Sequence, residues 1–490
     1  MAMTEPRPLR ADHARPIPLQ RSGMRLTALI VACALLMQNL DSTVVSTALP
    51  VMAKAFRADP VHMNVALTSY LLSLAVFIPA SGWIADRYGT RSVFRAAIVV
   101  FTLGSVLCGR ADSLPFLVGA RILQGMGGAM MLPVGRLLLL RSVQKSELVA
   151  AMAWLTMPAL IGPVIGPPVG GFITTWWSWR WIFDINVPIG ILGVVLVTLF
   201  IPDVHEQRPG PFDGWGLALS AICLAGVMFG LELAGRGIVA PVVSASVVGT
   251  GALAGIGYWL HARRHPHPVL DLTLFRVPSF GVSVMSGSLF RIGVGAIPFL
   301  LPMMLQLGFG DSAAQSGLIT FASSGGALVM KPATQWALRH SGFRTTLFWN
   351  GILSALLLGA CATFRPDGSA AALYAVLLLG GFFRSLQFTA YNSLAYADIP
   401  RERMSAATSL YSTMQQLSLT LGISLGAAVL EIAIDLGGHA GPTLADFSAG
   451  FVAVGFVSLL AAPASLLMPR EAGAELSGRR AELPRSRRGL

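Results

Sequence analysis

The sequence is poor in charged residues. They make up 12% of its 490 residues, whereas 54% are hydrophobic and the mean hydropathy is +0.67. A soluble domain carries about 25% charged residues, so this composition is that of an integral membrane protein. The net charge of +12 would suit a nucleic-acid partner by its total alone, but the positions of the charges decide its meaning.

Lysine is scarcest among the charged residues, with Lys54, Lys145 and Lys331 as its three positions. None of them lies in a G-x-x-x-x-G-K-[ST] pattern, the loop that holds nucleotide phosphates. No segment is large enough to form a soluble ATPase domain either. We therefore expect no cofactor, and an ion gradient must drive any uphill transport.

Cysteine and histidine are also sparse and show no ligand spacing. The four cysteines lie in apolar runs without C-x-x-C or metal patterns and are interpreted as packing residues: Cys33, Cys108, Cys223 and Cys361. His261, His265 and His267 fall in a predicted cytoplasmic loop, and no Ser-His or His-rich set occurs in the apolar runs. The sequence predicts no metal site, no catalytic residue and no enzyme.

Apolar runs long enough to cross a bilayer as helices, about 20 residues each, occur fourteen times. They lie near 26–50, 65–85, 93–110, 114–137, 148–172, 180–201, 214–233, 238–261, 279–304, 314–336, 345–363, 371–391, 404–431 and 448–468. Their length fits helices, which satisfy their own backbone in lipid. The predicted fold class is an all-α integral membrane protein with fourteen transmembrane helices.

The distribution of Lys and Arg orients these helices. With the N-terminus inside, most of the 35 Lys and Arg residues fall in cytoplasmic tails and loops. The outer loops hold Lys54, Arg57, Arg110, Arg180, Arg236 and Arg365. The net charge is thus an insertion signal, which excludes a nucleic-acid partner. We expect a multi-pass protein of the bacterial inner membrane with both termini in the cytoplasm, functioning as a monomer.

An internal repeat divides the chain. "GWIADRYGTR" (82–91) ends the second apolar run and "QWALRHSGFR" (335–344) ends the tenth, while "ALPVM" (48–52) matches "LLPMM" (300–304). Duplicated halves with a site between them are typical of secondary transporters. The predicted parts are a cytoplasmic tail (1–24), a six-helix half (25–203), an extra two-helix hairpin (204–262), a cytoplasmic loop (263–278), a second six-helix half (279–469) and a cytoplasmic tail (470–490).

Five motifs in order resemble those of the major facilitator superfamily, and more narrowly its fourteen-span drug:proton antiporters of the EmrB/QacA type. They are "LDSTVVSTALP" (40–50), "GWIADRYGTR" (82–91), "RILQGMG" (121–127), "GPVIGPPVGG" (162–171) and "WRWIFDINVPIG" (179–190). Ser46 departs from the first motif, where the family has Asn, and Ile84 and Thr90 depart from the second. "GGAMMLPVGRL", "RIGVGAIPFLLPMMLQLG" and "QFTAYNSLAYADIP" are similar to the MdtD-type branch of multidrug proteins.

Asp41 is an acidic residue in an apolar run, where a charge costs about 2.5–3.5 kcal/mol. It lies about 24 Å along its helix from Arg25 at 1.5 Å per residue, a depth comparable with that of Arg121 on the fourth run. An ion pair is therefore possible. The strength of this ion pair would change with the access of water to the two side chains. The resemblance implies that Asp41 and Arg121 couple transport to protons, and a static ion pair between two helices is the alternative.

Two further motifs acquire roles through the resemblance. The loop after the second run would be a cytoplasmic gate, formed by Gly82, Asp86, Arg87, Gly89 and Arg91. The fifth run would be an antiporter hinge, formed by Gly162, Pro163, Gly166, Pro167, Gly170 and Gly171. Small residues at every fourth position let helices approach closely, and prolines bend a helix. A tight turn and simple close packing are the alternatives.

Polar residues inside the apolar runs are candidates for substrate contacts, because such residues usually face the bundle interior. They are Gln38, Asn39, Gln124, Arg291, Gln387, Tyr391 and Asn392. Arg291 and Arg384 favour an anionic or zwitterionic substrate over a purely cationic drug. Hydrogen bonding between helices is the alternative.

These features together predict a proton-coupled secondary transporter that exports small organic compounds, as in multidrug efflux, by alternating access. Its partners would be the substrate, protons and the lipid bilayer. One alternative is a proton-coupled exporter of a specific metabolite such as an organic acid. A second, from a different class, is a non-transporting membrane sensor or scaffold.

Overall fold

The computed structural model describes residues 21–56, 64–143, 147, 150–155, 162, 165–166, 169–170, 172–173, 176–201, 210–234, 240–311, 313–438, 442–469 and 472–473. Within these ranges every regular element is a helix. Ten of the described helical segments are long and apolar enough to cross a membrane, and Leu26–Asp41 and Gly214–Gly230 are shorter apolar helices. The all-helical membrane fold is confirmed. The count of fourteen spans stays a prediction, since most of the predicted span 148–172 lies outside the described residues.

The first half is built from the helices of the N-terminal repeat. They are α1 (Arg21–Phe56), α2 (Asn64–Phe77), η1 (Ile78–Ala80), α3 (Ser81–Tyr88), α4 (Thr90–Gly109), α5 (Leu114–Ser142), α7 (Trp181–Asp184) and α8 (Asn186–Phe200). The start of α5 is marked locally: Ser113 caps it by accepting a hydrogen bond from the Phe116 amide, and a proline occupies its first turn.

The second half repeats this arrangement. Its helices are α11 (Pro278–Gly295), α12 (Ile297–Met303), η4 (Met304–Gly308), α13 (Ala313–Ser341), α14 (Phe343–Ala360), η5 (Cys361–Thr363), α15 (Ala370–Leu394), η6 (Arg401–Arg403), α16 (Met404–Gly437), α17 (Leu444–Leu459) and α18 (Ala461–Ser465). Thr443 and Asp446 form a capping box that begins α17, and Gly438 ends α16 in the left-handed conformation.

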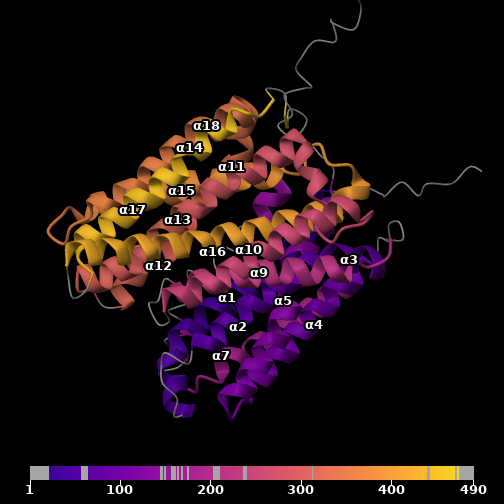
Figure 1. The fold of residues 1–490 in the computed structure, drawn as a ribbon, viewed down its shortest axis with the longest axis horizontal. Helices are drawn as coiled ribbons and strands as arrows, with labels where there is room; N and C mark the ends of the chain where they lie inside the picture. Colours follow the sequence, from indigo (N-terminus) through magenta and orange to yellow (C-terminus); the bar gives the residue numbers. More distant parts are fainter. Residues whose placement is uncertain are drawn as a thin grey trace, which may run out of the picture.

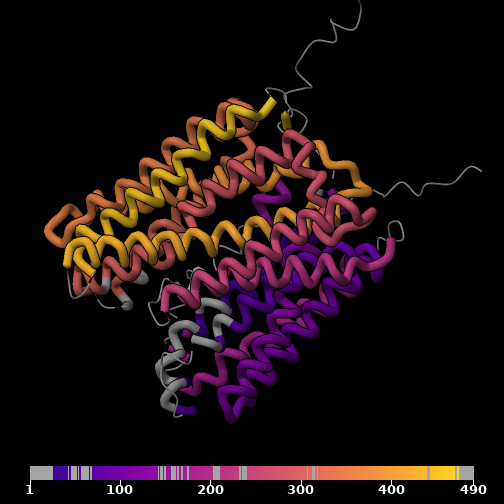
Figure 2. Tube along the Cα trace, in the orientation of Figure 1, coloured from indigo at the N-terminus to yellow at the C-terminus, as the bar shows by residue number. Residues whose placement is uncertain are grey.

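Between the halves lie α9 (Gly214–Ala234) and α10 (Pro241–Arg264), which pack against each other. Figure 1 shows this pair beside α16, the long helix along which the second half meets the first. Glycine makes the close approach possible, because a Cβ on Gly226 would lie 2.8 Å from the Cα of Gly251. In the trace, both members of the pair run along the bundle between the two halves (Figure 2).

The repeated loop motif has the same backbone in both halves. Gly89 lies between α3 and α4 with φ of 84°, and Gly342 lies between α13 and α14 with φ of 76°. Side chains rarely adopt such positive φ angles, which explains the glycine at both positions. The sequence repeat is therefore also a repeat of local structure.

Candidate functional site

Asp41 and Arg121 form a fully buried ion pair. Asp41 lies on α1 and Arg121 on α5, and the guanidinium contacts the carboxylate oxygen Oδ2 at 2.6 Å. Both side chains have 0% exposure. The contact predicted from helix depth is thus present in the structure. Breaking such a buried pair on one side is strongly destabilising, because the remaining charge is left uncompensated.

Neutral donors hold the second oxygen of the same carboxylate. Gln124 on α5 donates to Oδ1 at 2.9 Å, and Asn186 at the start of α8 donates to the same atom at 2.9 Å. Both amides also donate to the hydroxyl of Ser105 on α4, at 2.7 and 2.8 Å. The carboxylate on α1 is therefore bound from α5 and α8, and Ser105 links these donors to α4.

Arg121 has further partners of its own. Its Nε donates to the carbonyl of Ala66 at 3.1 Å, and a second donor reaches the side-chain oxygen of Gln124 at 2.6 Å. The guanidinium also lies over the ring of Tyr70, 4.4 Å from the centroid, a cation–π contact. Loss of the Asp41 charge would leave Arg121 tied to α2 and α5 rather than to α1.

Sequence reasoning missed three members of this network: Tyr70, Ser105 and Asn186. Asn186 belongs to the quoted motif of residues 179–190, but no role was assigned to it. The signal that could have found Ser105 and Asn186 is the one that found Asp41, a polar side chain in an apolar run that must find partners.

The substrate candidates of the N-terminal half divide between this network and its surroundings. Gln124 belongs to the network itself. Gln38 and Asn39 are half-buried on α1. The Asn39 amide donates to the Leu35 carbonyl at 2.9 Å, one turn earlier on its own helix.

The candidates of the C-terminal half form a second buried cluster. Arg291 on α11 donates to Asn392 at 3.4 Å and also to Tyr411, and its guanidinium lies 4.8 Å from the centroid of the Tyr411 ring. Gln387 donates to the Leu347 carbonyl at 3.0 Å and to Tyr391 at 3.4 Å. The structure brings the predicted residues together.

The loop motif reaches both halves. Asp86 accepts a hydrogen bond of 2.7 Å from Arg141 on α5 and a further one from the Ser405 hydroxyl on α16. A Cβ on Gly82 would lie 2.8 Å from the Ser405 carbonyl oxygen, so only a residue without a side chain lets α3 pack this closely. Arg91 donates to the Thr198 carbonyl on α8, whereas Arg87 is exposed.

Further contacts close the two halves together at this end. Arg136 on α5 is buried and donates to Tyr396 and Ser412 at 3.3 Å and to Gln415 at 3.1 Å, all in the second half. The Ser409 hydroxyl donates to the Pro79 carbonyl at 2.7 Å. Arg136 was not singled out from the sequence, because a single Arg near a helix end is also what the positive-inside rule produces.

The predicted hinge is described in part. Gly162, Gly166 and Gly170 are buried, and Pro163, Pro167 and Gly171 lie outside the described residues. A Cβ on Gly162 would lie 3.0 Å from the Cβ of Asn39 and 3.0 Å from the Leu40 amide nitrogen. Gly162 therefore packs against α1 one residue from Asp41.

The model of the Major Facilitator Superfamily matches residues 31–423 and 284–489. A protein that carries the name multidrug resistance protein MdtD, from Pectobacterium carotovorum subsp. carotovorum (strain PC1), is 38% identical over 413 residues, covering 84% of this chain and 88% of that protein. The protein of the same name from Serratia proteamaculans (strain 568) is 39% identical over 403 residues, covering 82% and 84%. This chain belongs to the Major Facilitator Superfamily, in its MdtD-type branch.

Solved structures share the fold of the superfamily. The human organic anion transporter MFSD10 (TETRAN) superposes with a TM-score of 0.68 at 15% identity, covering 90% of this chain and 99% of that one. The proton:xylose symporter XylE bound to 6-bromo-6-deoxy-D-glucose gives a TM-score of 0.63 at 16% identity, covering 94% and 99%. The chain is a multi-pass membrane transporter of small molecules and not an enzyme.

Proposed function

We propose that this transporter exports small organic compounds in exchange for protons, as a multidrug efflux protein. The MdtD relatives are named for multidrug resistance. The observation that carries the proposal is Asp41, a fully buried carboxylate whose partners are one arginine and neutral donors from other helices. Protonation of this carboxylate removes the charge that Arg121 neutralises, and the bonds across α1, α4, α5 and α8 then change together.

Alternating access would change the exposure of the Asp41 carboxylate to water, as a proton site requires. At the loop end, Asp86 joins Arg141 of its own half to Ser405 of the other half. We propose that these contacts form the cytoplasmic gate, with Gly82 and Gly89 shaping it and Arg87 and Arg91 flanking it. The predicted hinge, formed by Gly162, Pro163, Gly166, Pro167, Gly170 and Gly171, would lie beside α1, where a bend of one helix would move Asp41.

We further propose the complete architecture of two six-helix halves, residues 25–203 and 279–469, separated by an extra hairpin of residues 204–262. The close packing of α9 against α10 and their position between the halves support the hairpin. The excess of Lys and Arg in the predicted inner loops supports a bacterial inner membrane location with both termini cytoplasmic. A proton gradient would be the energy source, with no cofactor and a monomeric protein.

A specific observation favours a second candidate, the export of an organic acid. The C-terminal half holds Arg291, Lys331 and Arg384 within its helices, with Arg291 and Lys331 buried. Arg291 contacts Asn392 and Tyr411, and Lys331 donates to Thr389 at 2.9 Å. Cationic side chains along with Gln387 and Tyr391 would suit a carboxylate-bearing substrate better than a cationic drug.

The test is a liposome assay with purified protein and an imposed pH gradient. We expect cationic drugs, or organic acids under the second candidate, to dissipate the gradient through the intact protein. Asp41→Asn, which keeps the shape and the amide contacts, should remove this response. Asp112→Asn is the matched control, since that carboxylate has 94% exposure. Normal coupling in folded Asp41→Asn protein would refute the proton site.

A further inference from the structure

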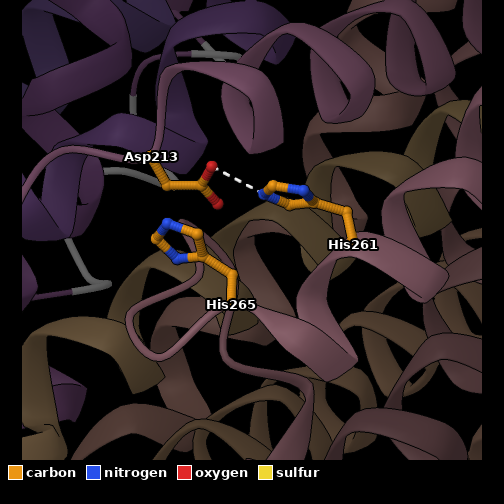
Figure 3. A group of neighbouring side chains, drawn as sticks. All are labelled: Asp213, His261 and His265. Atoms are coloured by element: carbon orange, nitrogen blue, oxygen red, sulfur yellow. Dashed lines mark hydrogen bonds and ion pairs between the residues drawn. The ribbon is translucent and has the colours of Figure 1, made fainter.

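Three side chains of metal-ligand type meet where α9 begins and α10 ends. Asp213 directly precedes α9, His261 lies in the last turn of α10, and His265 follows that helix as its cap. A ligand atom from each of the three lies within 4.8 Å of the other two. Figure 3 shows both imidazole rings beside the Asp213 carboxylate. The sequence predicted no metal here, because Asp213 is 48 residues from His261 in the chain.

The two histidines are spaced to share one face of a helix. Residues four apart on a helix lie one above the other, and the rings of His261 and His265 stack with their centroids 5.2 Å apart at 23°. His261 contacts the Asp213 Oδ1 through Nε2 at 2.7 Å. The Nδ1 of His265 accepts a long bond of 3.3 Å from the His267 amide. To bind a metal through Nε2, His265 must carry its proton on Nδ1. That nitrogen then no longer accepts the long bond from the His267 amide.

The carboxylate is held in place by backbone donors. The Gly216 amide donates to Asp213 at 2.8 Å and the Val269 amide donates at 3.3 Å. The backbone donors therefore fix the carboxylate beside the two imidazole rings.

The donor set selects a class of ion. Two imidazoles and one carboxylate are ligands of Zn²⁺ and neighbouring transition metals, whereas Ca²⁺ and Mg²⁺ prefer sets made of oxygen alone. If Asp213 served only to cap α9 and to bind His261, the positions of these two residues would be explained. The position of His265, which stacks on His261 within reach of the same carboxylate, would not. We propose that Asp213, His261 and His265 bind a Zn²⁺ ion with an open fourth position.

The site lies next to the loop motif at the junction of the halves. Phe212 packs on Trp83 of α3 with ring centroids 4.9 Å apart, and Trp83 donates to the Gly210 carbonyl at 2.8 Å. In the segment that follows α10, Asp271 pairs with Arg403, which directly precedes α16. Zn²⁺ would join the segment before α9 to the end of α10, and so stabilise the link between α3 and α16. This inference does not depend on the identity of the exported compound.

The test measures Zn²⁺ binding to full-length protein in detergent, without a histidine tag and after removal of metal by a chelator. Titration calorimetry with ZnCl₂ should give one site with a Kd of about 10 μM or tighter. We expect His261→Ala and His265→Ala each to weaken binding at least about tenfold, or about 1.4 kcal/mol. His267→Ala is the matched control and should bind as the unaltered protein does.

Thermal unfolding provides a second readout of the same site. Zn²⁺ at saturation should raise the melting temperature of the unaltered protein, because it binds the folded state and not the unfolded one. His265→Ala should fold normally, since the contacts of its ring with the described residues are the stacking and the long amide contact, and it should show no such rise. No Zn²⁺ binding by the unaltered protein, or equal binding by His265→Ala, would overturn the proposal.

Discussion

The fourth helix of each half carries the same four-residue pattern with different consequences. In α5, Arg121 and Gln124 of "RILQ" both contact the carboxylate of Asp41. In α15, Arg384 of "RSLQ" donates to the Ser323 hydroxyl at 2.7 Å, and Gln387 accepts from Asn350 at 2.6 Å. The arginine and glutamine of the duplicated pattern thus contact a carboxylate in one half and neutral groups in the other.

The difference lies in the first helix of each half. The offset of 252 that matches "ALPVM" to "LLPMM" places Gly293 at the position of Asp41. A Cβ on Gly293 would lie 2.5 Å from the Cβ of Ser458, so the second half has no room there for an acid. Arg384 instead borders a cavity of about 20 Å³ with Ser323 and Ser354, large enough to hold one water. Of these two arginines, Arg121 pairs with a carboxylate, whereas the hydrogen-bond partner of Arg384 among the described residues is a hydroxyl.

The largest expected effect comes from breaking the ion pair. Arg121→Gln leaves the buried Asp41 carboxylate with amide donors only, and removal of one partner of a buried pair costs about 3–5 kcal/mol. Thermal unfolding in detergent should show a large loss of stability, with transport lost as well. The double variant Arg121→Gln with Asp41→Asn should recover much of that stability, because no uncompensated charge remains.

Arg384→Gln is the matched substitution in the second half. It removes one charge-assisted hydrogen bond to Ser323, worth about 1.5–3 kcal/mol, and leaves an uncharged partner behind. We expect a smaller loss of stability than for Arg121→Gln and retained proton coupling. Equal losses in the two variants would mean that the shared pattern, and not the carboxylate of Asp41, sets the contribution of the arginine to stability.

The loop motif gives a second matched pair, with an intermediate effect. Asp86 bonds to Arg141 and Ser405, whereas Arg339 stands at the corresponding position of the second copy and is exposed. Asp86→Asn should cost about 2 kcal/mol and slow transport several-fold in the liposome assay, because the contact between the halves weakens. Arg339→Gln should change neither. A similar slowing by Arg339→Gln would contradict a gate confined to the first copy.

The membrane fold and part of the candidate site could be predicted from the sequence, whereas other contacts of the site could not. Apolar runs, the repeat and the positive-inside charges predicted the helical membrane fold, because the bilayer constrains length and composition directly. Asp41 and Arg121 could be paired because helix rise converts sequence position into depth. Asn186 could not be placed in the same network, since helix rotation about its axis follows from packing and not from depth.

Contacts between the halves were the least predictable part. Arg136 and Ser405 lie in segments whose polar residues also fit an exposed loop end, and only the packing of α16 on α3 and α5 buries them. The cluster of Asp213 with His261 and His265 has the same origin, because it forms only when α9 and α10 pack side by side. Sequence spacing identifies residues that share a helix face or a depth in the bilayer, and tertiary packing decides which of them meet.

The smallest expected effect tests what the two halves share. Gly89 and Gly342 have φ of 84° and 76°, so both turns use a backbone conformation that residues with side chains rarely adopt. Alanine at either position strains the backbone, with an expected loss of roughly 1–2 kcal/mol in each case. Gly89→Ala and Gly342→Ala should therefore lower the melting temperature by similar amounts, while Gly119→Ala, on α5 with open space beside it, should not. A loss confined to Gly89→Ala would show that the first turn depends on the gate contacts, and that the copies share sequence without sharing the energetics of their backbone.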